Sequence, residues 1–527
     1  MSALPKRTRR ALAVTLAAGL PALLALHALS FGRVPAGLEG GAAVEALRGV
    51  HLILRRRFEV LSFAIGPSAE TLWLYLVGAS VELLGPRWIS VVLPSILAAA
   101  AVVMLTVLVA LRLDPEMPPA IPFLLSAGSV WLFHYGQVGL RAIAAPLFFL
   151  VVCLLLERAE RPDSPARFHA ATGFVLGLSL YAYSSCRVLP VAWLLLKVLQ
   201  WIQEKDARAR LKSALLAGLA GLSAASIPNL LFFLREPGEF LFRGYYVYRG
   251  DWWWRPVNIF WTALLPFHHP RLYTAWLGDG HNFDATAVTL TGAGVLPVDP
   301  VTAAAYACGL VLAFRGPRPA GLSYVLSVLG TATLLLGMSG PSLTRLLLLQ
   351  PAYVLVAALA LSRAWQRRPR TRAVLASALL VPGALGAVQY AWTFGRSPAA
   401  QADYLPEMNA LSARARDLAD ADPALRVLLV ARRGKDIAKF YNYRHIARIW
   451  LVEGAANGPS AVAEAIRRFQ PGVVLVERAD SLADVAASLG AASGTAPFYE
   501  IRLPATDESA GQPEPGNLRR LWNEIRR

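Results

Sequence analysis

Charged side chains are scarce in this chain, and acidic ones are scarcer than basic ones. Only 16% of the 527 residues are charged, 56% are hydrophobic, and the mean hydropathy is +0.46. This composition excludes a chain that is soluble throughout, because a soluble protein of this size carries a larger charged fraction. The shortage of acidic residues leaves a net charge of +18. In a membrane protein that surplus indicates basic cytoplasmic loops, so we predict no nucleic-acid partner.

Cysteine is also rare, and its placement indicates no metal site. The three cysteines lie in or at the ends of apolar runs and lack metal-ligand spacing: Cys153, Cys186 and Cys308. We interpret them as small hydrophobic residues. His268, His269 and His281 have no paired carboxylate or cysteine spacing beside them, so no metal ligand is assigned, and a need for a divalent metal is left open.

Apolar runs long enough to cross a hydrocarbon core of about 30 Å recur between Ala11 and Phe394. We predict eleven transmembrane helices at Ala11–Ser30, Trp88–Leu113, Ile121–Phe133, Ile143–Leu156, Ala171–Ser184, Val188–Ile202, Ala214–Leu234, Val298–Phe314, Leu322–Met338, Leu346–Leu361 and Val374–Phe394. The first resembles a signal peptide but is long enough to span, and we treat it as a retained anchor. The fold class is an α-helical polytopic membrane protein.

The basic clusters between these helices fall on one side if the N-terminus is cytoplasmic, and the strongest is the arginine-rich stretch 362–372. This agreement requires Thr71–Leu84 to be an interfacial helix and not a span. Two long loops, 31–87 and 235–296, then face the exterior of a prokaryotic plasma membrane. Residues 1–394 form the membrane module, and residues 395–527 form an exterior domain.

The C-terminal domain has the pattern of a small α/β unit. We predict strands at Val427–Ala431, Ile449–Val452 and Val473–Glu477, and helices at Ser460–Phe469 and Leu482–Leu489. It contains no phosphate-loop or dinucleotide fingerprint.

Several short motifs follow one another in an order that a known family shares. They are Ala69-Glu70-Thr-Leu-Trp-Leu-Tyr75, Leu84-Gly85-Pro86, Leu93-Pro-Ser95, Val138-Gly-Leu-Arg141-Ala-Ile-Ala-Ala-Pro146, Gly177-Leu-Ser-Leu-Tyr181-Ala-Tyr183-Ser-Ser-Cys-Arg187-Val-Leu-Pro190, Gly278-Asp279, His281-Asn282 and Pro341 to Arg345. Their order resembles that of bacterial polytopic glycosyltransferases of the dolichyl-phosphate-mannose–protein mannosyltransferase type, which share the GT-C fold with aminoarabinose transferases. The Tyr-x-Tyr to Arg-x-x-Pro segment is the most specific piece.

The resemblance implies an inverting glycosyltransferase that transfers a sugar from a polyprenyl-phosphate carrier to an acceptor on the exterior face. Its partners would be that lipid-linked sugar, membrane lipid, and an acceptor that is a protein, lipid or glycan. In this reading Glu39 is the general base or orients the acceptor. The other implied binding residues are Glu70, Arg141, Tyr181, Tyr183, Arg187, Asp279, His281, Asn282 and Arg345. Among them, the three arginines would surround the carrier phosphate, which a guanidinium binds as a fork.

The sequence departs from the family pattern at three positions. Leu38 stands where the family carries an Asp before its Glu, Gln137 where an Arg precedes Gly-Leu-Arg, and Val92 where an Arg precedes Leu-Pro-Ser. These losses keep a second function open, a non-catalytic relative that binds a lipid-linked sugar or scaffolds an envelope complex. A third alternative is a lipid-carrier transporter or flippase, although no internal repeat is evident.

Overall fold

The computed structural model describes residues 5–30, 37–55, 59–62, 69–161, 163–204, 208–238, 254–267, 296–315, 319–338, 342–367, 370, 372–394, 397, 404–445, 447–477, 482 and 498–502. The chain forms two compact units. The first unit contains Met1–Val34, Glu70–Trp73 and Ser95–Ala400, and the second contains Pro35–Ala69, Leu74–Pro94 and Gln401–Arg527.

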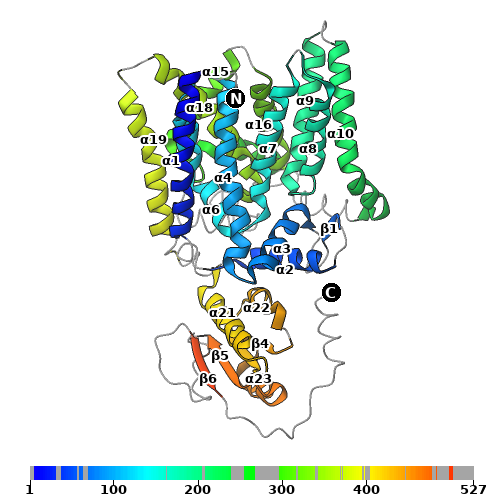
Figure 1. Ribbon diagram of the computed structural model, residues 1–527, viewed down its shortest axis with the longest axis vertical. Helices are drawn as coiled ribbons and strands as arrows, with labels where there is room; N and C mark the ends of the chain where they lie inside the picture. The colour runs from blue at the N-terminus through cyan, green and yellow to red at the C-terminus, as the bar shows by residue number, and fades with distance from the viewer. Residues whose placement is uncertain are drawn as a thin grey trace. The chain divides into compact units, whose positions relative to one another are not determined.

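The first unit is built from helices (Figure 1). They are α1 (Lys6–Ser30), most of α4 (Trp88–Leu113), α5 (Ala120–Ala127), α6 (Val130–Val138), η1 (Arg141–Ile143), α7 (Ala144–Ala159), α8 (Ala166–Ser179), η2 (Ser184–Arg187), α9 (Val188–Gln203), α10 (Arg208–Arg235), α12 (Trp254–Ala263), η4 (Leu265–Phe267), α15 (Pro300–Arg315), α16 (Ala320–Met338), α17 (Leu343–Leu346), η5 (Leu347–Leu349), α18 (Gln350–Arg367), α19 (Arg372–Val388) and the π-helical turn η7 (Gln389–Phe394). The bounds of α4 are those that the sequence predicted.

Among the described residues, seven helical stretches are long and apolar enough to cross a membrane: Lys6–Ser30, Trp88–Leu113, Arg141–Ala159, Ser184–Gln203, Arg208–Arg235, Ala320–Met338 and Leu343–Arg367. Shorter apolar helices cover Leu72–Leu84, Pro300–Arg315 and Arg372–Val388. The chain is therefore a multi-pass membrane protein, and this prediction is confirmed. The number of eleven spans stays a prediction.

The segment Ile121–Phe133 is not one continuous helix, and that prediction was wrong. Gly128 caps the end of α5, and Ser129 adopts an extended conformation in which its side chain accepts a hydrogen bond from Leu132 N. Ser129 is therefore an N-cap that starts a new helix, α6. A Cβ on Gly128 would lie 3.1 Å from Gly383 in α19, so the break also lets two helices approach closely.

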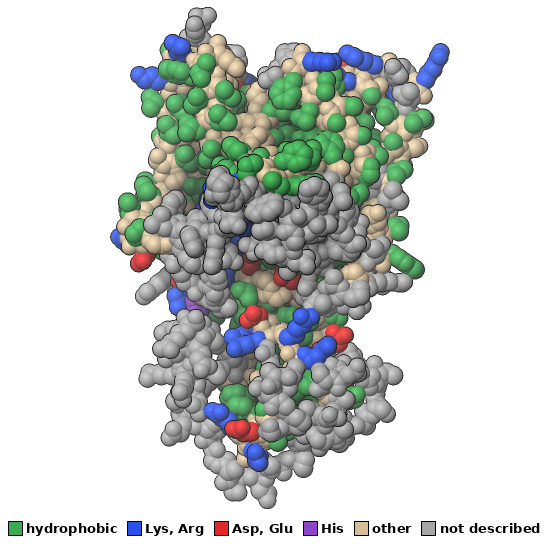
Figure 2. Space-filling model, turned by 180° about the vertical axis from the view of Figure 1, so that it is seen from behind, with side chains coloured by type: hydrophobic (Ala, Val, Ile, Leu, Met, Phe, Trp, Pro, Cys, Tyr) green, Lys and Arg blue, Asp and Glu red, His purple; other side chains and the backbone are tan. Residues whose placement is uncertain are grey.

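Hydrogen bonds and an ion pair join the ends of neighbouring helices near the basic stretches of the chain. Thr8 near the start of α1 donates to Pro115 O after α4 (3.2 Å), and Ser362 near the end of α18 donates to Asp114 (2.7 Å). Lys197 near the end of α9 pairs with Glu160 just after α7. Figure 2 shows hydrophobic side chains over the surface of the helices and a row of lysine and arginine side chains along one end of these helices. This segregation is typical of a membrane protein with basic loops on one side.

The helices α8 and α10 lie side by side at very short range. A Cβ built on Gly173 would lie 1.8 Å from Gly218 O, and one on Gly221 would lie 2.0 Å from Ala170 O. Small residues at such crossings let two backbones approach closely within a membrane. This contact places α10 beside the turn that follows α8.

The second unit combines two helices from the early chain with an α/β domain. Its elements are α2 (Gly40–Arg55), β1 (Leu61–Ser62), the first residue of β2 (Ala69–Glu70), most of α3 (Leu72–Leu84), α21 (Pro406–Ala421), β3 (Val427–Ala431), α22 (Lys435–Asn442), η8 (Tyr443–His445), β4 (Ile449–Glu453), α23 (Gly454–Phe469), β5 (Val473–Glu477) and β6 (Phe498–Arg502). A helix of 13 residues such as α3 rises about 20 Å, which is shorter than a hydrocarbon core.

The sheet of the second unit has the order β4-β3-β5-β6, in which β3 is parallel to β4 and β5, and β6 is antiparallel to β5. Leu428 and Val430 face Val462 of α23, whereas α21 contacts β3 and β5. Because β3 has helices packed on it, all five of its residues are buried. The predicted C-terminal α/β domain is confirmed. The predicted helix Leu482–Leu489 lies outside the described residues except for Leu482.

Candidate functional site

The candidate site of the first unit is centred on Glu70, whose carboxylate is 1% exposed. The Nε atom of Arg141 lies 3.7 Å from Glu70 Oε2, and the Nη2 atom of Arg187 lies 3.6 Å from Glu70 Oε1. The sequence thus named three residues that the structure brings together. We call them the Glu70 cluster.

Local chain geometry places both arginines at helix starts. Gly139 has φ 85° and ends α6, and Arg141 opens η1, which continues into α7. Arg187 is the last residue of η2 and immediately precedes α9. Backbone N–H groups at a helix start carry partial positive charge, which adds to the charge of the guanidinium groups.

The Glu70 cluster carries a net positive charge because two guanidinium groups surround one carboxylate. The side chain of Arg187 is 38% exposed and that of Arg141 is 18% exposed, whereas Glu70 is buried. The buried carboxylate therefore pairs with two partly exposed arginines and restrains their positions. An arrangement of this kind suits an anion that has planar or tetrahedral oxygens, above all a phosphate.

The aromatic ring of Tyr183 contacts the cluster. The Cζ atom of Arg141 lies 5.8 Å from the ring centroid, within the range of a cation–π interaction. Tyr183 is 8% exposed. Its ring therefore fixes the guanidinium of Arg141.

Tyr181 has a structural connection that sequence reasoning missed. Its hydroxyl donates to Ala225 O (2.9 Å) and accepts from Asn229 N (3.1 Å), two groups that bond each other in a regular helix. The hydroxyl is thus inserted into the hydrogen-bond ladder of α10, next to Pro228, which lies inside that helix. The carbonyl of Tyr181 accepts from Leu72 N (2.9 Å), two residues after Glu70.

Arg345 lies in α17, which contacts η2, the turn that ends with Arg187. The neighbouring Thr344 hydroxyl lies 2.6 Å from the hydroxyl of Tyr135 in α6. These contacts bring the starts of α7 and α9 together with α17. Tyr135 and Thr344 were not named from the sequence, because no pattern in the chain distinguishes a buried tyrosine from one in a site.

The Glu70 cluster lies at the opposite ends of α7 and α9 from the Lys197–Glu160 pair. Both helices begin beside the cluster, at Arg141 and Arg187, and both end near that pair. Glu70, Arg141 and Arg187 therefore lie at the end of α7 and α9 away from the Lys197–Glu160 pair. That this end faces the exterior stays a prediction.

Glu39 belongs to the second unit, where it caps α2. Its Oε2 atom accepts from Ala42 N (3.2 Å), and its carbonyl accepts from Ala43 N (3.0 Å). This is the geometry of an N-cap residue, so Glu39 has a structural role whatever its chemistry. Its assignment as the base stays a prediction.

The departures from the family pattern have local explanations. Leu38 is fully buried in the second unit. Gln137 is also fully buried, and its Nε2 atom lies 2.8 Å from Nδ1 and 3.0 Å from the carbonyl oxygen of His27 in α1. Val92 is buried as well. Each position is thus part of the hydrophobic or neutral interior.

The remaining predicted residues, Asp279, His281 and Asn282, lie outside the described residues. Within the part of the chain that the structure describes, no group of three His, Cys, Asp or Glu side chains is arranged to hold a metal ion. The described part of the site contains two guanidinium groups, one carboxylate and an aromatic ring.

No family model matches the sequence, and no curated protein sequence matches it either. Solved structures that resemble most of this chain include two of the same protein. The crystal structure of ArnT from Cupriavidus metallidurans in the apo state has a TM-score of 0.56 and 11% identity, covering 92% of this chain and 97% of that one. The structure of the same protein bound to undecaprenyl phosphate has a TM-score of 0.53 and 14% identity, covering 95% and 100%. The chain therefore has the GT-C fold of these aminoarabinose transferase structures, as its motifs implied.

Proposed function

We propose that this chain is a membrane glycosyltransferase that takes a sugar from a polyprenyl-phosphate carrier and transfers it to an acceptor at the exterior face. The observation that carries the proposal is the Glu70 cluster, a positively charged group with a buried carboxylate behind two arginines. It occurs in a fold shared with an ArnT structure solved bound to undecaprenyl phosphate.

The chemistry of the transfer requires such a cluster. The acceptor hydroxyl oxygen forms a bond to the anomeric carbon, and the bond from that carbon to the phosphate oxygen breaks. The phosphate leaves with the electron pair, so negative charge develops on its oxygens. Arg141 and Arg187 would stabilise that charge through fixed donors, and Arg345 in α17 would add a third cation. Direct displacement inverts the anomeric configuration.

A base must take the proton of the acceptor hydroxyl, and we assign this role to Glu39. Because Glu39 also caps α2, an alanine substitution would remove the base and the helix cap together, and its effect could not be assigned to either. Glu39→Gln keeps an oxygen that can accept from Ala42 N but cannot take a proton. We expect this variant to fold normally and to lose about 100-fold or more in kcat. Wild-type turnover in this variant would rule out the assignment.

The proposal is tested with the purified full chain in lipid nanodiscs. Binding is measured with undecaprenyl phosphate, and transfer with a panel of undecaprenyl-phosphate-linked sugars and mixed protein, lipid and glycan acceptors. Undecaprenol, which has the same tail without a phosphate, is the matched control ligand. We expect the phosphate to bind at least tenfold more tightly than the alcohol. Equal binding of both ligands would contradict the proposal.

A non-catalytic lipid-linked-sugar-binding protein is the second candidate. The burial of Leu38 and the Gln137–His27 contact favour it, because neither position supplies the charge that the family pattern has there. Binding of the lipid-linked sugar without its turnover by any acceptor would support this candidate. A lipid-carrier flippase is distinguished by movement of the carrier between leaflets without cleavage.

A further inference from the structure

The α/β domain of the second unit makes a specific contact with the segment that carries Glu39. Asn409 lies in the first turn of α21, and its side chain is 6% exposed. Its Oδ1 atom accepts from Leu38 N (3.0 Å), and its Nδ2 atom donates to Leu38 O (3.2 Å). One side-chain amide therefore makes both hydrogen bonds that a neighbouring β-strand would make to this residue.

The same amide also fixes its own helix start. The Nδ2 atom of Asn409 donates to Tyr404 O (2.8 Å) and to Leu405 O (3.1 Å). Leu405 has φ 42°, a left-handed conformation that non-glycine residues adopt at a cost. The Asn409 side chain thus joins two backbone segments that are far apart in the sequence and stabilises both.

The backbone at Gly37 packs tightly against the start of α21. A Cβ on Gly37 would lie 2.4 Å from Tyr404 O and 2.6 Å from Asn409 Nδ2, so the chain passes the start of α21 too closely for any side chain there. Leu38 is 0% exposed. Because α2 begins directly after Glu39, the position of Leu38 sets the start of that helix.

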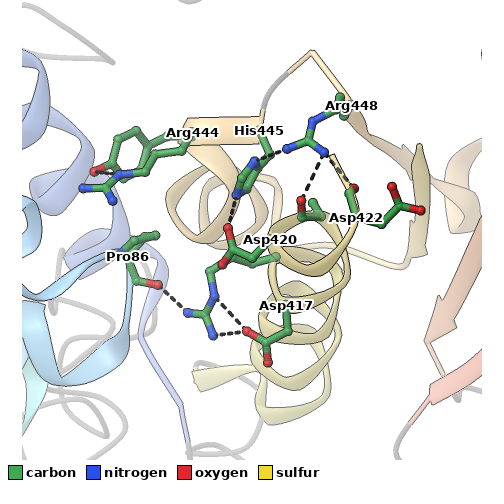
Figure 3. Close-up of polar contacts among 10 residues, drawn as sticks. Pro86, Asp417, Asp420, Asp422, Arg444, His445 and Arg448 are labelled. Atoms are coloured by element: carbon green, nitrogen blue, oxygen red, sulfur yellow. Dashed lines mark hydrogen bonds and ion pairs between the residues drawn. The ribbon is translucent and has the colours of Figure 1, made fainter. Parts of the chain in front are cut away.

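A second residue on the same face of α21 extends the contact. Arg416 follows Asn409 by two helical turns and donates from Nη1 to Pro86 O (2.8 Å), while Nε donates to Asp417 (3.0 Å), as Figure 3 shows. Beside it, His445 lies between Asp420 (2.7 Å) and Arg448 (2.7 Å), and Arg448 also donates to Ala419 O in α21 (3.1 Å) and to Asp422 O just after it (3.0 Å). The C-terminal half of α21 is therefore anchored as well, through contacts with Pro86, His445 and Arg448.

We propose that Asn409 is a positioning residue for Glu39, and that the α/β domain serves to fix the orientation of that carboxylate. The inference rests on the proposed function, because it assigns Asn409 a role in the step that Glu39 performs. Asn409 touches neither donor nor acceptor in this proposal. It acts through the backbone of Leu38 and the first turn of α2.

The first measurement is hydrogen exchange of the full chain in nanodiscs. We expect Asn409→Ala to speed exchange of the amides of residues 38–43 by about tenfold or more, because the Leu38 N–H loses its acceptor. Asn442→Ala is the matched control, since Asn442 is also buried in the second unit but donates within α22 to Ala438 O (2.9 Å). Unchanged exchange in residues 38–43 of Asn409→Ala would overturn the proposal, whether or not the protein transfers sugar.

The second measurement is a double-mutant cycle on sugar transfer. We expect Asn409→Ala to lower kcat by about 10- to 100-fold with the donor KM within about twofold, since a misplaced base slows chemistry without weakening donor binding. In a Glu39→Gln background the same substitution should have little further effect. An equal loss in both backgrounds would overturn the proposal, and full activity of Glu39→Gln alone would overturn the assignment of Glu39.

Discussion

The Nη2 atom of Arg187 lies 3.6 Å from the carboxylate of Glu70, across a separation of more than 100 residues in the sequence. The carboxylate is buried and the guanidinium is partly exposed. In the proposed function, Glu70 balances part of the charge of Arg141 and Arg187 while no phosphate is bound.

We predict that Arg187→Ala weakens binding of undecaprenyl phosphate by about 10- to 100-fold, since a charge-assisted hydrogen bond contributes about 1.5 to 3 kcal/mol. The affinity of Arg187→Lys should lie between those of the wild type and Arg187→Ala, because lysine keeps the positive charge but lacks the two parallel N–H donors of a guanidinium. Arg210→Ala is the control: Arg210 pairs with Glu204 (3.7 Å) at the start of α10 and should not affect binding. An equal loss of binding affinity in Arg187→Ala and Arg210→Ala would show that Arg187 does not bind the phosphate. Binding is measured by calorimetry in nanodiscs.

Glu70→Gln should destabilise the first unit. The substitution keeps the size of the side chain but removes the buried negative charge beside Arg141 and Arg187. Because both guanidinium groups are only partly exposed, we expect a loss of about 1 to 3 kcal/mol. Undecaprenyl phosphate should restore part of the lost stability, because its phosphate supplies an anion in the same place. We would measure melting temperatures with undecaprenyl phosphate and with undecaprenol. A phosphate effect no larger in the variant than in the wild type would contradict this prediction.

Tyr181→Phe should loosen α10 at its proline. The substitution removes the hydroxyl that accepts from Asn229 N and donates to Ala225 O, and both groups are in a buried part of the helix. We expect a loss of about 1 to 3 kcal/mol and faster hydrogen exchange of the Asn229 amide. Tyr183→Phe also loses a hydroxyl but keeps the ring that contacts Arg141, so it serves as the control. Unaltered exchange at Asn229 would show that the inserted hydroxyl is dispensable.

Much of the fold follows from the sequence because the signals are local. Apolar length predicted a multi-pass membrane protein, and the bounds of α4, β3 and β5 agree with the predictions. The break at Gly128 was missed because hydropathy does not change across it. The helix α21 was also missed, although its buried residues Met408, Leu411, Ala415 and Leu418 recur at helical spacing.

The candidate site was predicted only in part. Glu70, Arg141 and Arg187 were found because a family motif marks each one, and the structure brings them together. The inserted hydroxyl of Tyr181 could not be predicted, since it depends on the packing of α8 against α10. Asn409 has no signal in the sequence, because its partner Leu38 is 371 residues away.

Gln137→Arg, which restores the arginine of the family pattern, should destabilise the protein. Gln137 is fully buried, and its amide contacts the ring and carbonyl of His27. A guanidinium there would be a buried cation beside a histidine, at a cost of about 3 kcal/mol or more. Gln137→Met, of similar size and uncharged, should be milder. A melting temperature of Gln137→Arg equal to that of the wild type would show that the interior can accept the charge.

The stability of the second unit should fall at high pH because of Tyr443. Burial, together with a hydrogen bond of 2.5 Å to Glu82, raises the pKa of the Tyr443 phenol from 10 to about 12. The folded state therefore holds this proton more tightly than the unfolded state does. The resulting stabilisation is complete below pH 10 and is lost as the pH rises through about 12.

Tyr443→Phe removes the titrating group, so its melting temperature should decline less between about pH 9 and pH 12. Tyr75→Phe, which removes a phenol that accepts from Glu59 N, is the control. Identical declines in wild type and Tyr443→Phe would show that Tyr443 does not contribute.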